Sequence, residues 1–135
     1  MGDPMKMNTG VLAYLGDAVY ELYIRKYLAD TGQIHTDRLH AAAVNFVRAG
    51  AQAAVCRKLV DELPEDEQSL VRRARNRRIG AGTKSAGPMD YKWATAFEAL
   101  IGYYYLSERT EDMEELILKA INLIGADMRK GANGK

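Results

Sequence analysis

Apolar residues recur at the spacing of an α-helix along almost the whole chain, and this periodicity limits the possible folds more than any other feature. Residues three or four positions apart share one face of a helix, whereas a half-buried strand alternates apolar and polar residues. No segment shows a convincing strand pattern, and only three prolines interrupt 135 residues. The sequence therefore predicts an all-α protein, and the length predicts a single domain over residues 1–135 with its own hydrophobic core.

Capping and breaking residues divide the pattern into separate helices. Asn8 or Thr9 can cap the first helix, Gly32 can end it, and Pro64 ends a later one. We expect helices at residues 9–30, 36–63 with a break near Gly50, 65–77, 90–106 and 110–128, a glycine-rich loop at 79–88, and frayed ends at 1–8 and 129–135.

The bulk composition is that of a folded protein with little net charge. Apolar residues make up 47% and charged residues 27%, and the formal charge of +1 indicates neither a nucleic acid nor a membrane as partner. Cys56 is the single cysteine and cannot form an internal disulfide. No run of 18 apolar residues and no signal-peptide pattern is present. We therefore expect a cytoplasmic protein with no membrane partner.

Two carboxylates stand inside apolar helical stretches. Asp17 follows Gly16 within "VLAYLGDAVYELYI", and it shares a helix face with Glu21. One interpretation places Asp17 at a solvent-facing edge and pairs Glu21 with Arg25. The other places Asp17 against a second helix that approaches closely at Gly16.

Glu98 is the only charged residue of "WATAFEALIGYYYL", and the small residues Ala94 and Gly102 lie four positions to either side of it. Glycine inside a helix costs about 1 kcal/mol relative to alanine, so a close helix contact should compensate for it. Two facing carboxylates repel each other unless a cation lies between them, and Mg²⁺ binds one or two carboxylates together with water and phosphate oxygens. The pattern therefore predicts a Mg²⁺ site formed by Asp17 and Glu98 from two packed helices.

The segments around these acids resemble the signature segments of the ribonuclease III catalytic domain. "LAYLGDAVYE" (Leu12–Glu21) and "TAFEALIGYYYL" (Thr95–Leu106) are most similar to those of its small branch, Mini-III ribonuclease. "VRAGAQA" (Val47–Ala53) and "RRARN" (Arg72–Asn76) are similar to two further segments of that branch. The resemblance extends over roughly residues 12–123.

The resemblance implies an all-α homodimer that cleaves double-stranded RNA with Mg²⁺ in a cleft at the dimer interface. The metal-binding, catalytic acids of the family fall on Asp17 and Glu98, where Mg²⁺ would polarise the phosphoryl group and activate the attacking water. Glu21 would order a water molecule behind the metal ligands. The cellular task implied is maturation of the large-subunit (23S) ribosomal RNA precursor, and a large-subunit ribosomal protein is a candidate partner.

The chain also departs from full-length ribonuclease III. Ala13 and Thr95 stand where full-length enzymes have two further acids, which implies fewer direct metal ligands and more water around the ion. The Mini-III branch has small or neutral residues there too. Ala74 replaces a glycine usual in the "RGRN" segment. We expect no double-stranded-RNA-binding domain in a chain of this length.

A basic segment is the candidate RNA-binding surface. Six of the nineteen cations lie between Ser69 and Met89, and this segment contains no acidic residue. Such a run can be merely a solvated face, but beside a glycine-rich loop it can contact the phosphates of A-form RNA. Gln52 can either reach a 2′-hydroxyl or cap a helix turn. The candidate RNA-binding residues are Arg72, Arg73, Arg75, Asn76, Arg77, Arg78, Lys84 and Gln52.

Two other functions compete with the nuclease. A non-catalytic RNA-binding or ribosome-associated module on the same fold would be expected to lose the acids, whereas this chain keeps Asp17 and Glu98. An all-α nucleotide pyrophosphohydrolase would need clustered Glu-x-x-Glu pairs, which the acidic segments of this chain do not supply.

Overall fold

The computed structural model describes the backbone of residues 2–77 and 88–133, and every regular element in them is helical. This confirms the all-α prediction for the described part of the chain. The elements are η1 (Pro4–Lys6), α1 (Thr9–Ala29), α2 (Thr36–Val47), α3 (Ala49–Leu59), η2 (Val60–Glu62), α4 (Glu65–Asn76), α5 (Pro88–Leu106) and α6 (Thr110–Asn133). The predicted loop at 79–88 lies almost wholly outside the described residues.

Local sequence signals account for most helix ends. The side chain of Asn8 accepts hydrogen bonds from the amides of Gly10 and Val11 at 2.8 and 3.2 Å and so caps α1. Gly32, with φ of 90°, follows the end of α1. The α2–α3 break lies at Arg48, two residues before the expected Gly50, because Arg48 has an extended backbone. At the C-terminus, α6 continues beyond Met128 through most of the segment expected to be frayed.

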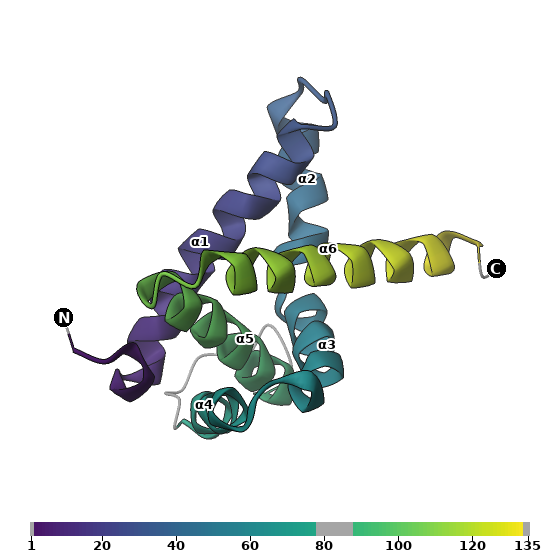
Figure 1. The fold of residues 1–135 in the computed structure, drawn as a ribbon. Coiled ribbons are helices and arrows are strands. Elements are labelled where there is room, and N and C mark those ends of the chain that lie inside the picture. Colours follow the sequence, from purple (N-terminus) through teal and green to yellow (C-terminus); the bar gives the residue numbers. More distant parts are fainter. Residues whose placement is uncertain (1, 78–87, 134–135) are drawn as a thin grey trace.

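Helix α5 lies at the centre of the domain and packs against α1, α3 and α4 (Figure 1). A helix that is apolar around its whole circumference must be buried on most sides, which is why the segment around Glu98 became the central helix. Phe97, Leu100 and Ile101 are all at most 2% exposed. The Phe97 ring packs edge-on against Tyr20 of α1, with 5.1 Å between centroids.

Two glycines allow α1 and α5 to cross in direct backbone contact. A Cβ at Gly16 would overlap the carbonyl oxygen of Glu98, and a Cβ at Gly102 would overlap the carbonyl oxygen of Leu12. This is the close approach expected from the sequence. It fixes the position of Glu98 on α5 relative to the segment of α1 that carries Asp17.

A buried ion pair joins α4 to the turn between α5 and α6. Glu67 is 1% exposed, and its carboxylate accepts hydrogen bonds from the Tyr104 hydroxyl and, at 2.8 Å, from the Arg109 guanidinium. Arg109 also donates to Asp112 at 2.9 Å. A buried charge of this kind is tolerated when it is paired and fully hydrogen-bonded, so the cluster holds the two helical corners together.

None of the described helices combines the length and hydropathy that a membrane crossing requires.

Candidate active site

Asp17 and Glu98 lie beside each other across the α1–α5 contact. Asp17 is exposed on α1, whereas Glu98 is half-buried on α5. The two carboxyl groups are close enough for their charges to interact and for a side-chain hydrogen bond when one of them is protonated. Residues far apart in the sequence thus form one acidic pair, as the spacing of acids and glycines predicted.

Burial, the Asp17 charge and the hydrogen bond with Asp17 raise the pKa of Glu98 to about 8, while a side-chain hydrogen bond with Gln52 works in the opposite direction. Glu98 also acts on the neighbouring core, since its charge adds to burial in raising the pKa of Tyr20. The Tyr20 hydroxyl donates to the Phe46 carbonyl at 3.0 Å and is thereby held neutral next to the pair. Burial and the mutual repulsion of the two carboxylates favour the binding of a cation between them.

Glu21 forms the ion pair with Arg25 that one interpretation of the sequence expected. The distance is 3.0 Å, and both side chains are at least 40% exposed. An exposed pair four residues apart on a helix adds only about 0.3–0.5 kcal/mol and can open easily. Glu21 therefore lies on the same face as Asp17 while its carboxylate is engaged by Arg25.

Gln52 lies in the interior, with 1% of its surface exposed. Its Nε2 donates to the carbonyl of Val47 at 2.8 Å and so caps the C-terminal end of α2 across the break at Arg48. This placement favours the capping alternative over direct contact with a ribose hydroxyl. Among the described residues its Oε1 is the only buried side-chain nitrogen or oxygen without a hydrogen-bond partner.

The acidic pair fits Mg²⁺ by the chemistry of its donors. Two carboxylates and the unpartnered oxygen of Gln52 are hard ligands, which Mg²⁺ prefers, and the ion commonly keeps several waters around one or two protein carboxylates. The described residues contain no cluster of three or more His, Cys, Asp or Glu side chains suited to a metal. Any ion bound here would therefore rely on water and substrate oxygens for its remaining ligands.

The described part of the basic segment lies beside the N-terminal end of α1. The Arg73 guanidinium donates to the carbonyl of Met5 at 3.1 Å, and the Arg77 guanidinium lies against Gly10. Gly10 precedes Asp17 by seven residues, or about 10 Å along a helix that rises 1.5 Å per residue. Arg77 thus lies beside the helix that carries Asp17, about two turns away from that residue. Arg78 and Lys84 lie outside the described residues.

The other residues of this segment differ in exposure and in the contacts that their side chains make. Arg72 is exposed, and Asn76 is exposed with its Oδ1 accepting a 3.1 Å hydrogen bond from Arg75. Arg75 is half-buried, and its guanidinium stacks 5.0 Å from the centre of the Trp93 ring on α5. Arg75 therefore helps attach α4 to α5, whereas Arg72 is exposed and makes no side-chain hydrogen bond or ion pair with the described residues.

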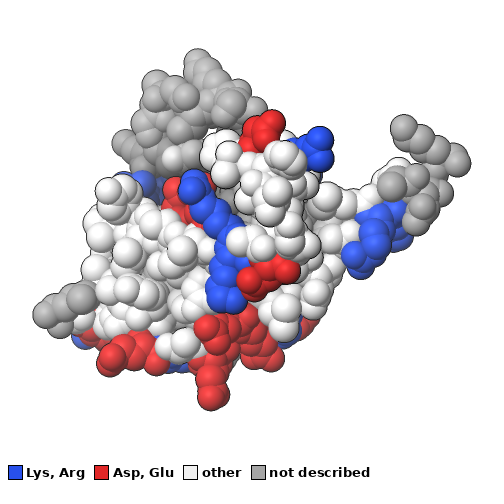
Figure 2. Space-filling view, turned by 90° about the horizontal axis from the view of Figure 1, so that it is seen from above, with Lys and Arg blue, Asp and Glu red and all other residues white. Residues whose placement is uncertain are grey.

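Charge is unevenly distributed over the surface. In Figure 2, acidic side chains gather along one edge of the molecule, and basic side chains lie in its middle and next to the C-terminal end. The first turns of α4 and α6 together carry five acids, namely Glu65, Asp66, Glu67, Glu111 and Asp112, of which Glu67 is buried. A nucleic acid would avoid the acidic edge because its phosphates are repelled there.

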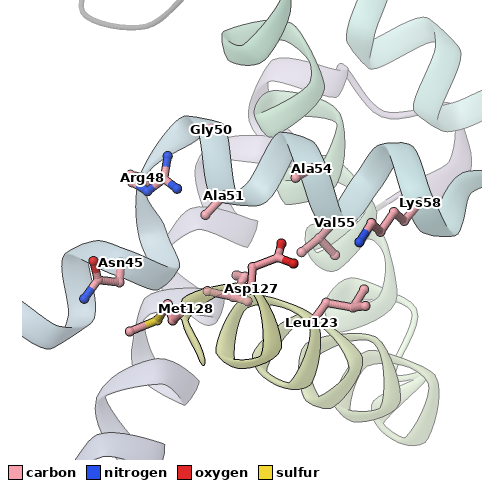
Figure 3. Close-up of a pocket in the computed structure, with 11 residues that line it drawn as sticks. Asn45, Arg48, Gly50, Ala51, Ala54, Val55, Lys58, Leu123, Asp127 and Met128 are labelled. Carbon is pink, nitrogen blue, oxygen red and sulfur yellow. The ribbon is translucent and has the colours of Figure 1, made fainter. Parts of the chain in front are cut away.

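A separate cavity lies between α3 and the C-terminal half of α6 (Figure 3). Val55 and Leu123 contribute apolar walls, and the carboxylate of Asp127 reaches from α6 toward α3. Neither Asp17 nor Glu98 lines this cavity. It therefore plays no part in the acidic pair.

Comparison with known proteins agrees with this geometry. The model of the family described as Ribonuclease III domain matches residues 10–109, a range that includes both acids. Mini-ribonuclease 3 of Brevibacillus brevis is 44% identical over 122 residues, which cover 90% of this chain and 91% of the relative. Mini-ribonuclease 3 of Symbiobacterium thermophilum is 40% identical, covering 92% and 95%.

A solved structure shares the fold. The crystal structure of a protein from Fusobacterium nucleatum is 34% identical and superposes with a TM-score of 0.82, covering 90% of this chain and 98% of that one. Sequence identity of this extent over nearly the whole length, together with the matched fold, establishes the family. This chain therefore belongs to the ribonuclease III domain family, and within it to the Mini-ribonuclease 3 group of endoribonucleases.

Proposed function

We propose that this endoribonuclease cleaves double-stranded RNA with Mg²⁺ held by Asp17 and Glu98, and that its substrate is a large-subunit (23S) ribosomal RNA precursor. The observation that carries the proposal is the meeting of these two acids across the α1–α5 contact, with Glu98 raised in pKa by burial and by Asp17. The choice of ribosomal RNA follows from the Mini-III resemblance.

Each side chain has a defined task in this proposal. Asp17, exposed on α1, faces the RNA backbone, while Glu98 supplies the deeper carboxylate. Bound Mg²⁺ would stabilise the charge that develops on the phosphoryl group and lower the pKa of the attacking water. No side-chain nucleophile is required, and Glu21 can order a solvent molecule once its exposed pair with Arg25 opens.

The arginines beside α1 would hold the duplex. Arg72, Arg73 and Arg77 are exposed, and Arg73 and Arg77 lie on the side of the acidic pair where α1 begins. Contacts to phosphates position a duplex without reading its sequence. The exposed basic side chains thus complement the acidic pair, which contacts only the scissile phosphate.

We propose further that the enzyme is a homodimer. Val11, Tyr14 and Leu22 are 52%, 84% and 66% exposed and, with the exposed Ala18, form an apolar stripe along α1. A second copy of the stripe would bury this surface in a two-fold symmetric contact. Tyr14 lies three residues before Asp17, so the partner would also close one side of the acidic pair.

A cleavage assay with the full chain tests the function. We expect duplex RNA to be cut only with Mg²⁺, and single-stranded RNA and nucleoside triphosphates to remain intact. Asp17→Asn keeps nearly the same shape and should retain the circular dichroism spectrum while losing cleavage. Cleavage by that variant at saturating Mg²⁺ would show that Asp17 is not a catalytic residue. Hydrolysis of the triphosphates would favour the pyrophosphohydrolase alternative.

A further inference from the structure

We propose that Gln52 is a positioning residue of the acidic pair: its amide holds the Glu98 carboxylate, and its Oε1 accepts a hydrogen bond from a water molecule at the Mg²⁺ site. This inference rests on the proposed function and extends it to α3. It also gives Gln52 a role other than the RNA contact considered from the sequence.

The amide of Gln52 connects two parts of the fold. Gln52 is 1% exposed at the contact of α3 with α5. Its Nε2 carries two hydrogens: one is donated to the Val47 carbonyl at 2.8 Å, and the amide lies near enough to the Glu98 carboxyl to lower its pKa. Glu98 is therefore tied to the fixed end of α2 as well as to its own helix.

The oxygen of the same amide has no partner. Buried polar atoms are almost always hydrogen-bonded, and Gln52 Oε1 is the one exception among the buried side chains of the described residues. It belongs to a side chain that also contacts Glu98, next to the Asp17 carboxylate. An unpartnered amide oxygen next to two carboxyl groups defines a place suited to a water molecule or a hydrated cation.

Gln68 provides an internal comparison. Its Nε2 donates to the carbonyl of Leu63 at 2.9 Å, so Gln68 also uses its amide to cap the end of a helical segment. Gln68 is only partly buried, its other hydrogen bond goes to the carbonyl of Asp61, and it is not among the groups that shift the pKa of Glu98. A purely structural glutamine cap should therefore behave like Gln68, and a positioning residue should not.

The test measures Mn²⁺ as a stand-in for Mg²⁺ on the RNA-free full chain, by the loss of the free-ion signal in electron paramagnetic resonance. Gln52→Met, which keeps the length of the side chain, should weaken Mn²⁺ binding about tenfold or more and raise the Mg²⁺ concentration for half-maximal cleavage similarly. The KM for duplex RNA should change less than about twofold. Gln68→Met should lower the melting temperature and leave Mn²⁺ affinity unchanged.

Other outcomes overturn the inference in distinguishable ways. A Gln52→Met variant that loses thermal stability but keeps Mn²⁺ affinity would make Gln52 a cap only, and one that raises KM alone would make it an RNA contact. If the wild-type chain binds no Mn²⁺, or Asp17→Asn binds it equally well, the proposed function fails and the inference fails with it.

A second measurement needs no Gln52 variant and so survives a folding defect. The side-chain amide protons of Gln52 should shift in the nuclear magnetic resonance spectrum of the wild-type chain as Mg²⁺ is added, and those of Gln68 should not. The shift should be absent in Asp17→Asn. An unmoved Gln52 resonance at saturating Mg²⁺ would refute the positioning role.

Discussion

Gly16 lies directly against the main-chain carbonyl of Glu98, so that the helix carrying Asp17 and the helix carrying Glu98 touch through their backbones. Gly102 makes the reciprocal contact with the Leu12 carbonyl. Each glycine lies on one helix opposite the backbone of the other, which places the two acids side by side. The helix contact and the acidic pair are consequences of the same packing.

The first prediction follows from this contact. Gly16→Ala and Gly102→Ala should each destabilise the protein by about 1–3 kcal/mol or more, because a methyl group must displace a backbone carbonyl that cannot rotate away. Urea denaturation measures the change in free energy of unfolding. Cleavage should fall as well where the variant still folds, since the acids move apart.

Gly131→Ala is the matched control, because a Cβ at this helical position meets nothing within 4 Å. Alanine is the better helix former, so this variant should be as stable as the wild type or slightly more stable. Equal behaviour of the Gly16 and Gly131 variants would contradict the close helix crossing.

The second prediction concerns pH. The pKa of Glu98 is raised to about 8 in the folded, metal-free chain and is near 4.5 when unfolded. Between these values the folded state binds more protons than the unfolded state, so stability falls as pH rises toward about 8. Mg²⁺ binds the deprotonated form, and apparent Mg²⁺ affinity should therefore increase over the same range.

Melting temperatures of the metal-free chain between pH 5 and pH 9 check this prediction. Glu98→Gln mimics the protonated carboxyl and should abolish most of the decline toward pH 8, whereas Glu21→Gln should keep it. Should both variants and the wild type show the same pH profile, Glu98 would not be the titrating group.

The sequence predicted the acidic pair because it contained local signals for it. Acids inside apolar helices, each with a glycine nearby, indicated a buried close approach, and α1 and α5 meet there. Other features had no local signal. Glu67 looked like an ordinary favourable acid in the first turn of a helix, and only the fold brings Tyr104 and Arg109 over it.

The same limit applies to Gln52 and to the arginines. From the sequence, Gln52 could equally contact RNA or cap a helix, because the choice depends on which neighbours α5 and α2 bring to it. Arg72 and Arg75 look alike in a basic run, yet one is exposed and the other stacks on Trp93. Periodicity identifies helices and their buried faces, but it does not determine which side chains from separate helices meet.

The third prediction concerns RNA binding and salt. Arg72→Gln removes one exposed charge from the basic segment and should reduce the slope of log affinity against log salt by about 0.9 if it contacts one phosphate of a duplex. Filter binding or fluorescence anisotropy with Ca²⁺ in place of Mg²⁺ measures the slope.

Lys119→Gln is the control for charge alone. Lys119 is 47% exposed on α6 and pairs with Glu62 at 3.8 Å. Its loss changes net charge by the same amount but should leave the salt slope unchanged. Identical slopes for the wild type, Arg72→Gln and Lys119→Gln would show that Arg72 does not contact the RNA.

The fourth prediction concerns assembly. Leu22 is 66% exposed on the apolar stripe of α1, so Leu22→Glu costs little in the isolated chain but would place two glutamates near a symmetric interface. We expect the wild-type chain to sediment as a dimer and Leu22→Glu as a monomer at the same concentration. Ile34→Glu changes a residue that is 82% exposed in the α1–α2 connection, away from the stripe, and should remain dimeric.

Because the stripe borders Asp17, monomeric Leu22→Glu should also lose double-strand cutting while keeping its helical circular dichroism spectrum. A wild-type chain that sediments as a monomer while cutting both strands would show that one acidic pair needs no partner.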